Sequence, residues 1–232
     1  MSPGGPPEVL VFDMDGVLVD VMDSYREAIR ETVRHFTGAL VSHDEIQDFK
    51  NVGGWNNDWV LSHRMILDRG VTVEYADVVD YFNRVFFGEH GDGLICQERW
   101  MPEPGFLERL SERASLAIFT GRARYEADAT LSRYAPLIEF RPLVTDEAVA
   151  KPKPAPDGLH LIRNQHAGKS IWYLGDTVDD ALSASAAQVP FIGVSTRSNP
   201  RHAEVADILR SHGAFTVIEH VRELDEIIDT AA

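Results

Sequence analysis

Short, continuous apolar runs recur along this chain, and helical patterns separate several of them. The runs cover residues 8–12, 116–119, 171–174, 190–194 and, more weakly, 215–218. Four or five successive apolar residues without polar alternation are typical of a strand that is buried on both faces, as in a parallel sheet. Strands that alternate with helices are joined by right-handed crossovers. The sequence therefore predicts an α/β fold around a doubly wound, parallel, Rossmann-like sheet.

Residues 20–101 follow a different pattern. Apolar residues recur at helical spacing between Tyr25 and Phe36, and amphipathic stretches follow at residues 55–69 and 74–87. This spacing places the apolar side chains on one face of each helix. No convincing strand interrupts the segment, so we expect a helical cap that is inserted after the first strand.

The length of 232 residues suits one core that carries a sizeable insertion. We expect the α/β core at residues 8–19 and 102–232 and the helical cap at residues 20–101. Residues 1–7 are mostly glycine and proline, and we expect a flexible N-terminal tail there. This stretch lacks the basic region and the apolar core of a signal peptide.

The composition argues against several classes of partner. With 22 Lys and Arg against 37 Asp and Glu, the formal charge is −15 and no basic run stands out, so nucleic acid is not expected. No stretch approaches the roughly 18 apolar residues of a membrane span. Cys96 is the single cysteine, which excludes an intrachain disulfide and fits a reducing cytoplasm. The sequence does not indicate an oligomeric state.

The residues that could carry chemistry follow the expected strands or, in the case of Lys151, the stretch at residues 138–145. Ligands of an open parallel sheet bind beyond the carboxyl ends of the strands, so these residues should share one rim. In chain order they are Asp13, Asp15, Thr120, Gly121, Arg122, Lys151, Asp176 and Asp180. Carboxylates, a hydroxyl on a glycine turn and an amine together suit phosphoryl transfer.

A phosphate cannot approach several carboxylates unaided. Two like charges about 4 Å apart repel by roughly 4 kcal/mol at an effective dielectric constant of about 20. A divalent metal and the amine of Lys151 would reverse that balance. Because the acidic ligands are all oxygen donors and cysteine is scarce, Mg²⁺ is favoured over zinc.

Four stretches resemble, in order, the motifs of the haloacid dehalogenase-like hydrolases, in particular the phosphoglycolate-phosphatase-like branch with a helical cap after the first strand. They are Phe12-Asp-Met-Asp-Gly-Val17, Phe119-Thr-Gly-Arg122, Lys151-Pro-Lys-Pro-Ala-Pro-Asp-Gly-Leu159 and Gly175-Asp-Thr-Val-Asp-Asp180. The resembling core covers roughly residues 8–19 and 101–232. The cap matches only by its position and its helical character.

The resemblance implies that Asp13 is the nucleophile, and that Asp15 protonates the leaving oxygen and then activates water. Family members that cleave carbon–halogen bonds look different at the position of Asp15, so its presence argues for phosphate chemistry. Gly16 would allow the tight turn that follows.

The resemblance also implies that Thr120 and the amide of Gly121 bind phosphoryl oxygens. Lys151 would pair with the nucleophile and the phosphate, and Lys153, which begins its own Lys-Pro-Ala-Pro phrase, is the alternative. Arg122 is a further candidate for binding an acidic group of the substrate.

The implied Mg²⁺ ligands are carboxylates and one backbone oxygen. The carboxylates are those of Asp13, Asp15, Asp176 and Asp180, the last binding directly or through a water. The backbone oxygen is the carbonyl of Met14, which the family pattern gives at the second position of the Asp13-Met-Asp15 motif.

We therefore expect a phosphatase that acts on a small phosphorylated metabolite. A phosphomutase on the same scaffold, which passes the phosphoryl group to a sugar hydroxyl, is the alternative. A receiver protein that only stores an acyl phosphate is disfavoured, because Asp15 supplies a built-in hydrolytic acid and base. Phosphoglycolate, sugar phosphates, nucleoside monophosphates and histidinol phosphate all remain open as substrates, because specificity resides in the poorly matched cap.

Overall fold

The computed structural model describes residues 4–231. The described chain forms two compact units. One comprises the residues up to Val19 and from Trp100 onward, and the other is Asp20–Arg99. The first unit is built on a sheet and the second is helical.

The expected tail at residues 1–7 lies partly outside the described residues, which begin at residue 4. Within the described part, Pro7 is buried. The carbonyl oxygen of Pro6 accepts a hydrogen bond of 2.9 Å from the hydroxyl of Ser170. Residues 6 and 7 are therefore held against the start of a core strand.

A six-stranded sheet forms the centre of the α/β unit, in the order β5-β4-β1-β6-β7-β8, and its paired strands run parallel. The strands are β1 (Val9–Phe12), β4 (Ser115–Phe119), β5 (Leu143–Val144), β6 (Ile171–Gly175), β7 (Phe191–Val194) and β8 (Thr216–Ile218). Phe12 pairs with both Ile118 and Leu174, so the end of β1 lies between the ends of β4 and β6. The predicted α/β class and parallel sheet are confirmed.

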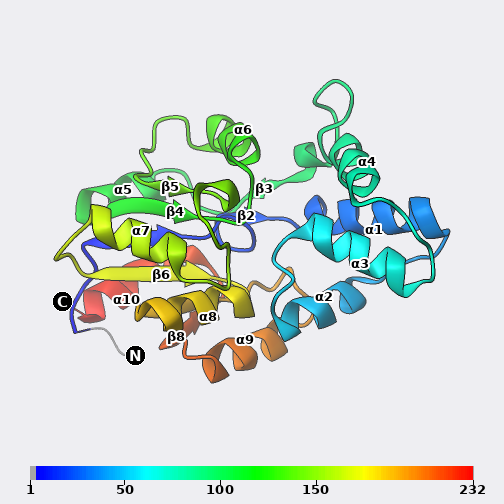
Figure 1. The fold of residues 1–232 in the computed structure, drawn as a ribbon. Coiled ribbons are helices and arrows are strands. Elements are labelled where there is room, and N and C mark those ends of the chain that lie inside the picture. The colour runs from blue at the N-terminus through cyan, green and yellow to red at the C-terminus, as the bar shows by residue number, and fades with distance from the viewer. Residues whose placement is uncertain (1–3, 232) are drawn as a thin grey trace. The chain divides into compact units, whose positions relative to one another are not determined.

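Helices accompany the strands of this unit (Figure 1). They are α5 (Phe106–Arg113), α6 (Arg124–Tyr134), α7 (Asp157–Gln165), α8 (Val178–Ala187), α9 (His202–Ser211) and α10 (Leu224–Ala231), with short 3₁₀ turns η2 (Asp146–Ala148) and η3 (Val221–Glu223). Side chains of α7, α8 and α9 share a core with Val9 and Val11 of β1. Leu10 and Phe12, on the opposite face of β1, are fully buried as well. Burial on both faces explains why the strands read as unbroken apolar runs.

The helical unit contains α1 (Tyr25–Thr37), α2 (His43–Val52), α3 (Asp58–Asp68), α4 (Tyr75–Phe87) and the 3₁₀ turn η1 (Leu94–Gln97). It has an apolar core of its own, to which Ile29, Met65 and Phe82 contribute. The spacing of apolar residues predicted three of these α-helices and missed α2. No helix that the structure describes is long and apolar enough to cross a membrane.

Two short strands lie where the chain passes between the units. They are β2 (Val19–Asp20) and β3 (Arg99–Trp100), which pair in a separate two-stranded sheet. The hydrogen bond from the Met101 N–H to the Leu18 carbonyl, 2.9 Å long, continues this pairing. The helical segment is thus an insertion whose two ends lie side by side.

Candidate active site

Asp13 lies directly after β1 and is buried. Its backbone N–H donates to the carbonyl oxygen of Leu174 at 2.8 Å, which ties the end of β1 to β6. The ammonium nitrogen of Lys153 lies 3.0 Å from Oδ1 of Asp13. The Met14 N–H donates to the same oxygen at 2.7 Å. A buried carboxylate is therefore held at the carboxyl end of the central strand.

The amine beside Asp13 belongs to Lys153, which corrects the expected placement of Lys151. The side chain of Lys153 is only 1% exposed, and its Nζ also lies 2.7 Å from Oδ1 of Asp180. Lys151 is exposed. A buried ammonium group must be paired, and the structure brings two carboxylates to Lys153. Because a shift of two residues preserves the Lys-Pro pattern, the pattern alone could not distinguish the two lysines.

Asp180 is tied to its surroundings through both carboxylate oxygens. Oδ1 accepts hydrogen bonds from Lys153 at 2.7 Å and from the hydroxyl of Tyr173 at 2.5 Å. Oδ2 accepts from the backbone N–H and the hydroxyl of Thr177 at 3.0 and 2.6 Å. An ionised carboxylate offers about four acceptor sites, and these four bonds use them. The main role of Asp180 in this structure is therefore to orient Lys153, and it has little acceptor capacity left for a metal.

Burial and the neighbouring charges together shift the pKa values of Asp13, Lys153 and Asp180. Burial raises the pKa of Asp13 to about 7, with Lys153 opposing the rise and the carboxylates of Asp180 and Asp15 adding to it. Burial also acts on Asp180, but the ammonium group of Lys153 holds its pKa below the ordinary value. For Lys153 itself, the two carboxylates outweigh burial and raise the pKa. Lys153 thus stays charged at neutral pH, while Asp13 has too little positive charge around it.

Three carboxylates lie close enough together to hold a cation. Asp13, Asp176 and Asp180 each offer an oxygen within 4.8 Å of the others. Hard divalent cations such as Mg²⁺ prefer oxygen donors, and a cation here would offset the surplus of negative charge. The donor set therefore fits Mg²⁺, with Asp13 and Asp176 as the better placed ligands because Asp180 is already engaged.

Two other expected metal ligands are engaged elsewhere. The carbonyl oxygen of Met14 accepts the N–H groups of Leu18 and Val19 at 2.8 and 2.9 Å, so it closes the turn after β1. This corrects the expectation that it faces a metal. Asp15 is not part of the carboxylate cluster that could hold a metal among the described residues, and its Oδ1 is bound by Arg122.

Gly16 allows the turn after β1 to approach the end of β6. Its φ of +70° lies in the left-handed region. A β-carbon at this position would lie 2.1 Å from Oδ2 of Asp176. The turn predicted from the sequence is present, and its glycine is required both by backbone conformation and by the closeness of Asp176.

Thr120 lies directly after β4 and is buried. Its backbone N–H donates to the Val144 carbonyl at 3.0 Å. Its hydroxyl oxygen accepts the N–H of Arg122 at 3.2 Å, which leaves the hydroxyl hydrogen to be donated elsewhere. Thr120 and Gly121 follow a strand adjacent to β1, so they lie on the same rim as Asp13.

The side chain of Arg122 is 1% exposed. Its Nε and Nη2 donate to Oδ1 of Asp15 at 2.9 and 2.5 Å. Its Nη1 donates to the hydroxyl of Thr130, on α6, at 2.6 Å. Arg122 is therefore engaged with a residue of the site itself.

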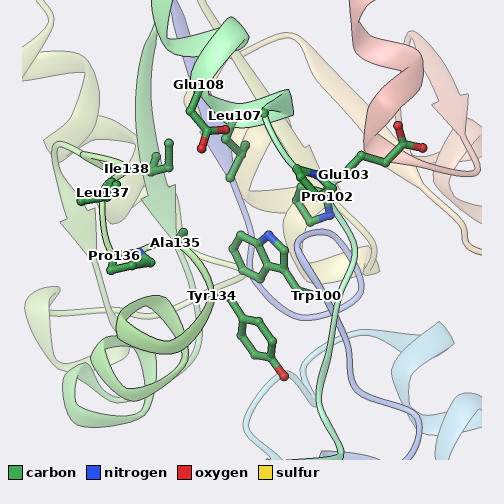
Figure 2. Close-up of a pocket in the computed structure, with 12 residues that line it drawn as sticks. Trp100, Pro102, Glu103, Leu107, Glu108, Tyr134, Ala135, Pro136, Leu137 and Ile138 are labelled. Atoms are coloured by element: carbon green, nitrogen blue, oxygen red, sulfur yellow. The ribbon is translucent and has the colours of Figure 1, made fainter.

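A cavity of about 270 Å³ also lies in the α/β unit, lined by residues between 100 and 108 and from 134 to 138. Figure 2 shows Trp100 beside Tyr134, whose ring stacks on it at 5.6 Å. Glu103 and Glu108 are the charged residues among those that line it. The residues that line it include no lysine or arginine to bind a phosphate, whereas Lys153 lies beside Asp13, so the carboxylate cluster around Asp13 is the better candidate for the active site.

Comparison with known proteins is consistent with this site. A family model of haloacid dehalogenase-like hydrolases matches residues 7–188. A protein from Phytophthora nicotianae named imidazoleglycerol-phosphate dehydratase is 31% identical over 244 residues, which cover 97% of this chain and 52% of that protein. This chain thus spans about half the length of that relative.

A phosphoglycolate phosphatase from Colwellia psychrerythraea is 25% identical over 194 residues, which cover 81% of this chain and 84% of that protein. Among solved structures, one from Bacteroides fragilis described as a haloacid dehalogenase-like hydrolase has a TM-score of 0.74. It is 19% identical and covers 94% of this chain and 99% of its own. At that identity the likeness supports the fold alone.

Several partners in the site carried no usable signal in the sequence. Tyr173 lies within an apolar strand and reads as a core residue, and only the structure shows its hydroxyl on Asp180. Thr130 lies in the middle of α6, eight residues after the arginine it binds. Thr177 is the exception, because a threonine three residues before an aspartate at a helix start is typical of a capping box, which the structure contains.

Proposed function

We propose that this chain, which belongs to the haloacid dehalogenase-like hydrolases, is a phosphatase that hydrolyses a small phosphate monoester through an aspartyl-phosphate on Asp13. The observation that carries the proposal is the buried Asp13 at the end of β1, 3.0 Å from the ammonium group of Lys153. Asp15, two residues later, presents a partly exposed carboxylate on the same turn.

In the first step, a carboxylate oxygen of Asp13 attacks phosphorus, and the bond from phosphorus to the leaving oxygen breaks. Protonated Asp15 donates its proton to the leaving oxygen, so the product is a neutral alcohol. Lys153 balances the charge of the phosphoryl group. The hydroxyl of Thr120 donates a hydrogen bond to a phosphoryl oxygen.

In the second step, the carboxylate of Asp15 takes a proton from water. The water oxygen bonds to phosphorus and the acyl phosphate bond to Asp13 breaks, which releases inorganic phosphate and restores the aspartate. Asp15 is then protonated for the next cycle. Asp180 and Tyr173 keep Lys153 in place throughout, through the hydrogen bonds described above.

We propose Mg²⁺ as the cofactor, held by Asp13 and Asp176 with Asp180 close by. When bound, it would neutralise charge on the phosphoryl oxygens. Without it, the raised pKa of Asp13 means that this carboxylate is ionised less readily than a nucleophile should be.

We propose that the helical unit is a cap that excludes water and selects the substrate. The names of the relatives suggest two phosphorylated carbon skeletons to try, phosphoglycolate and imidazoleglycerol phosphate. The second name belongs to a protein of which about half lies outside the match. A lone cysteine suits a reducing compartment, and we place the reaction in the cytoplasm.

The proposal is tested with p-nitrophenyl phosphate, which reports turnover without knowledge of the natural substrate. We expect phosphate release that requires Mg²⁺, stops with EDTA and is lost in Asp13→Asn. Normal turnover by Asp13→Asn would overturn the assignment of the nucleophile.

A panel of phosphorylated metabolites then identifies the substrate, and should include phosphoglycolate, imidazoleglycerol phosphate, histidinol phosphate, sugar phosphates and nucleoside monophosphates. Phosphate release supports the hydrolase. Formation of an isomerised sugar phosphate without net phosphate release would identify the mutase instead.

A further inference from the structure

The guanidinium group of Arg122 donates two hydrogen bonds to one carboxylate oxygen of Asp15 and neither of them to the other oxygen. Both Nε and Nη2 donate to Oδ1, at 2.9 and 2.5 Å. The two donors hold Oδ1 in place. Because Oδ1 lies off the Cβ–Cγ bond, this also fixes the rotation of the carboxylate about that bond. The second oxygen, Oδ2, is thereby turned away from the guanidinium group.

The arginine is itself immobilised at both ends. Its backbone N–H donates to the Thr120 hydroxyl at 3.2 Å, and its carbonyl oxygen accepts the N–H of Asp146 at 3.2 Å. At the other end, Nη1 donates to the Thr130 hydroxyl at 2.6 Å. The contact to Asp15 is thus made by a preorganised group, which spends little rotamer entropy on it.

Exposure shows which member of the pair can meet a substrate. The side chain of Arg122 is 1% exposed, whereas that of Asp15 is 31% exposed. A guanidinium group this buried has little surface with which to contact a substrate, and it already binds Asp15 and Thr130. The geometry therefore argues against the expected substrate contact.

Resting on the proposed function, we propose that Arg122 is a positioning residue for Asp15. It holds Oδ1 so that Oδ2 is the oxygen that passes the proton to the leaving group and later accepts one from water. The chemical steps and their balance are those given above, and Arg122 contributes the orientation of the carboxylate. Thr130, on α6, supports that orientation through the guanidinium group.

The two half-reactions need this orientation to different degrees. The p-nitrophenolate ion leaves without a proton, so formation of the acyl phosphate from p-nitrophenyl phosphate does not depend on a well-placed acid. An alkyl alkoxide needs the proton. Breakdown of the acyl phosphate needs Asp15 as a base whatever the leaving group was.

Arg122→Met therefore has a specific kinetic signature. With p-nitrophenyl phosphate, we expect a stoichiometric burst of p-nitrophenolate followed by slow steady-state turnover, because the acyl phosphate accumulates. Steady-state kcat should fall on the order of 10- to 100-fold, less than the full contribution of a general acid and base, since Asp15 remains. With an alkyl phosphate, the burst should be absent, because formation of the acyl phosphate is slowed as well.

Arg124→Met is the matched control. Arg124 is a neighbouring, exposed arginine whose guanidinium group pairs with Asp128 at 2.9 Å. It should show wild-type kcat and no added burst. Thr130→Val keeps the shape of the buried threonine but removes the hydroxyl that receives Arg122, and it should show a weaker form of the same burst. It also keeps the proposal testable if Arg122→Met does not fold.

The outcomes separate this inference from the proposed function. If the wild-type protein releases no phosphate from any monoester, the proposed function fails first. If the wild-type protein is active, a raised KM without a burst in Arg122→Met would show that Arg122 binds substrate, and would overturn its positioning role. A folded Arg122→Met variant with unchanged kinetics would overturn it equally.

Discussion

The buried Lys153 is the residue on which the charge balance of the site depends most. It lies between Asp13 and Asp180, at 3.0 and 2.7 Å. Removing one partner of a buried ion pair leaves an uncompensated charge, at a cost of about 3–5 kcal/mol. The same side chain also balances the incoming phosphate, so stability and activity should respond together.

We therefore expect Lys153→Met to lower the melting temperature and abolish phosphate release. Lys151→Met, two residues away and exposed, should change the stability by less than about 0.5 kcal/mol and keep wild-type activity. Thermal melts and p-nitrophenyl phosphate assays of the two variants check this. An inactive Lys151→Met beside an active Lys153→Met would contradict the assignment.

At the level of single residues, the sequence predicted which side chains follow the strands better than which lysine lies beside Asp13. Asp13, Asp15, Thr120 and Asp176 all lie at strand ends, as expected from where each apolar run stops. Lys153 could not be separated from Lys151, because burial is a property of the folded loop.

Among the elements, the turn between β1 and β2 brings two parts of the site together. Gly16, in this turn, has a φ of +70° and lies against Asp176. A methyl group there would meet the Asp176 carboxylate, which offers one of the oxygens proposed for Mg²⁺. The turn therefore couples a backbone conformation after β1 to a ligand after β6.

Gly16→Ala should raise the Mg²⁺ concentration needed for half-maximal activity, because Asp176 must move. Gly38→Ala is a matched control, since Gly38 has a φ of +72° but no atom within 4 Å of its would-be β-carbon. Both substitutions should lower the free energy of unfolding by about 1–3 kcal/mol, because alanine is strained at a positive φ. Mg²⁺ titrations of activity distinguish them, and an equal shift in both would contradict the role given to Gly16.

The elements of the sheet were largely readable from the sequence, because strands buried on both faces leave unbroken apolar runs. Helix α2 was not. It is ten residues long, and its start depends on the Ser42 side chain, which accepts the Glu45 N–H at 3.1 Å. A short helix that is defined by its cap and by packing in the helical unit gives little periodic signal.

For the whole molecule, the raised pKa of Asp13 links stability to pH. The pKa of Asp13 rises from 3.8 to about 7 on folding, chiefly through burial. Between these values the folded state binds more protons than the unfolded state, so stability falls as pH rises. The contribution is fully present below about pH 4 and is lost as the pH passes through about 7.

We expect the metal-free protein to lose stability relative to Asp13→Asn as the pH rises from 4 to 7. Melting temperatures of both proteins in EDTA across this range measure the difference, and titrating groups remote from Asp13 cancel in the comparison. Added Mg²⁺ should narrow the gap near pH 7. A difference between the two proteins that stays constant with pH would contradict the linkage.

The fold class followed from the apolar runs, whereas the identity of the substrate did not follow from any feature of the chain. Specificity is proposed to reside in the helical unit, whose side chains form a core of their own and match no motif. A single fold serves many substrates through such variable parts.

The central claim is that Asp13 becomes phosphorylated during turnover, and trapping the intermediate tests it most directly. The enzyme is mixed with p-nitrophenyl phosphate and Mg²⁺, quenched, reduced with borohydride and digested for peptide mass spectrometry. An acyl phosphate on an aspartate is converted to homoserine by this treatment. We predict homoserine at position 13 and at no other aspartate, dependent on substrate. Homoserine in place of another aspartate would contradict the account. So would turnover without any trapped residue under conditions where Arg122→Met shows a burst.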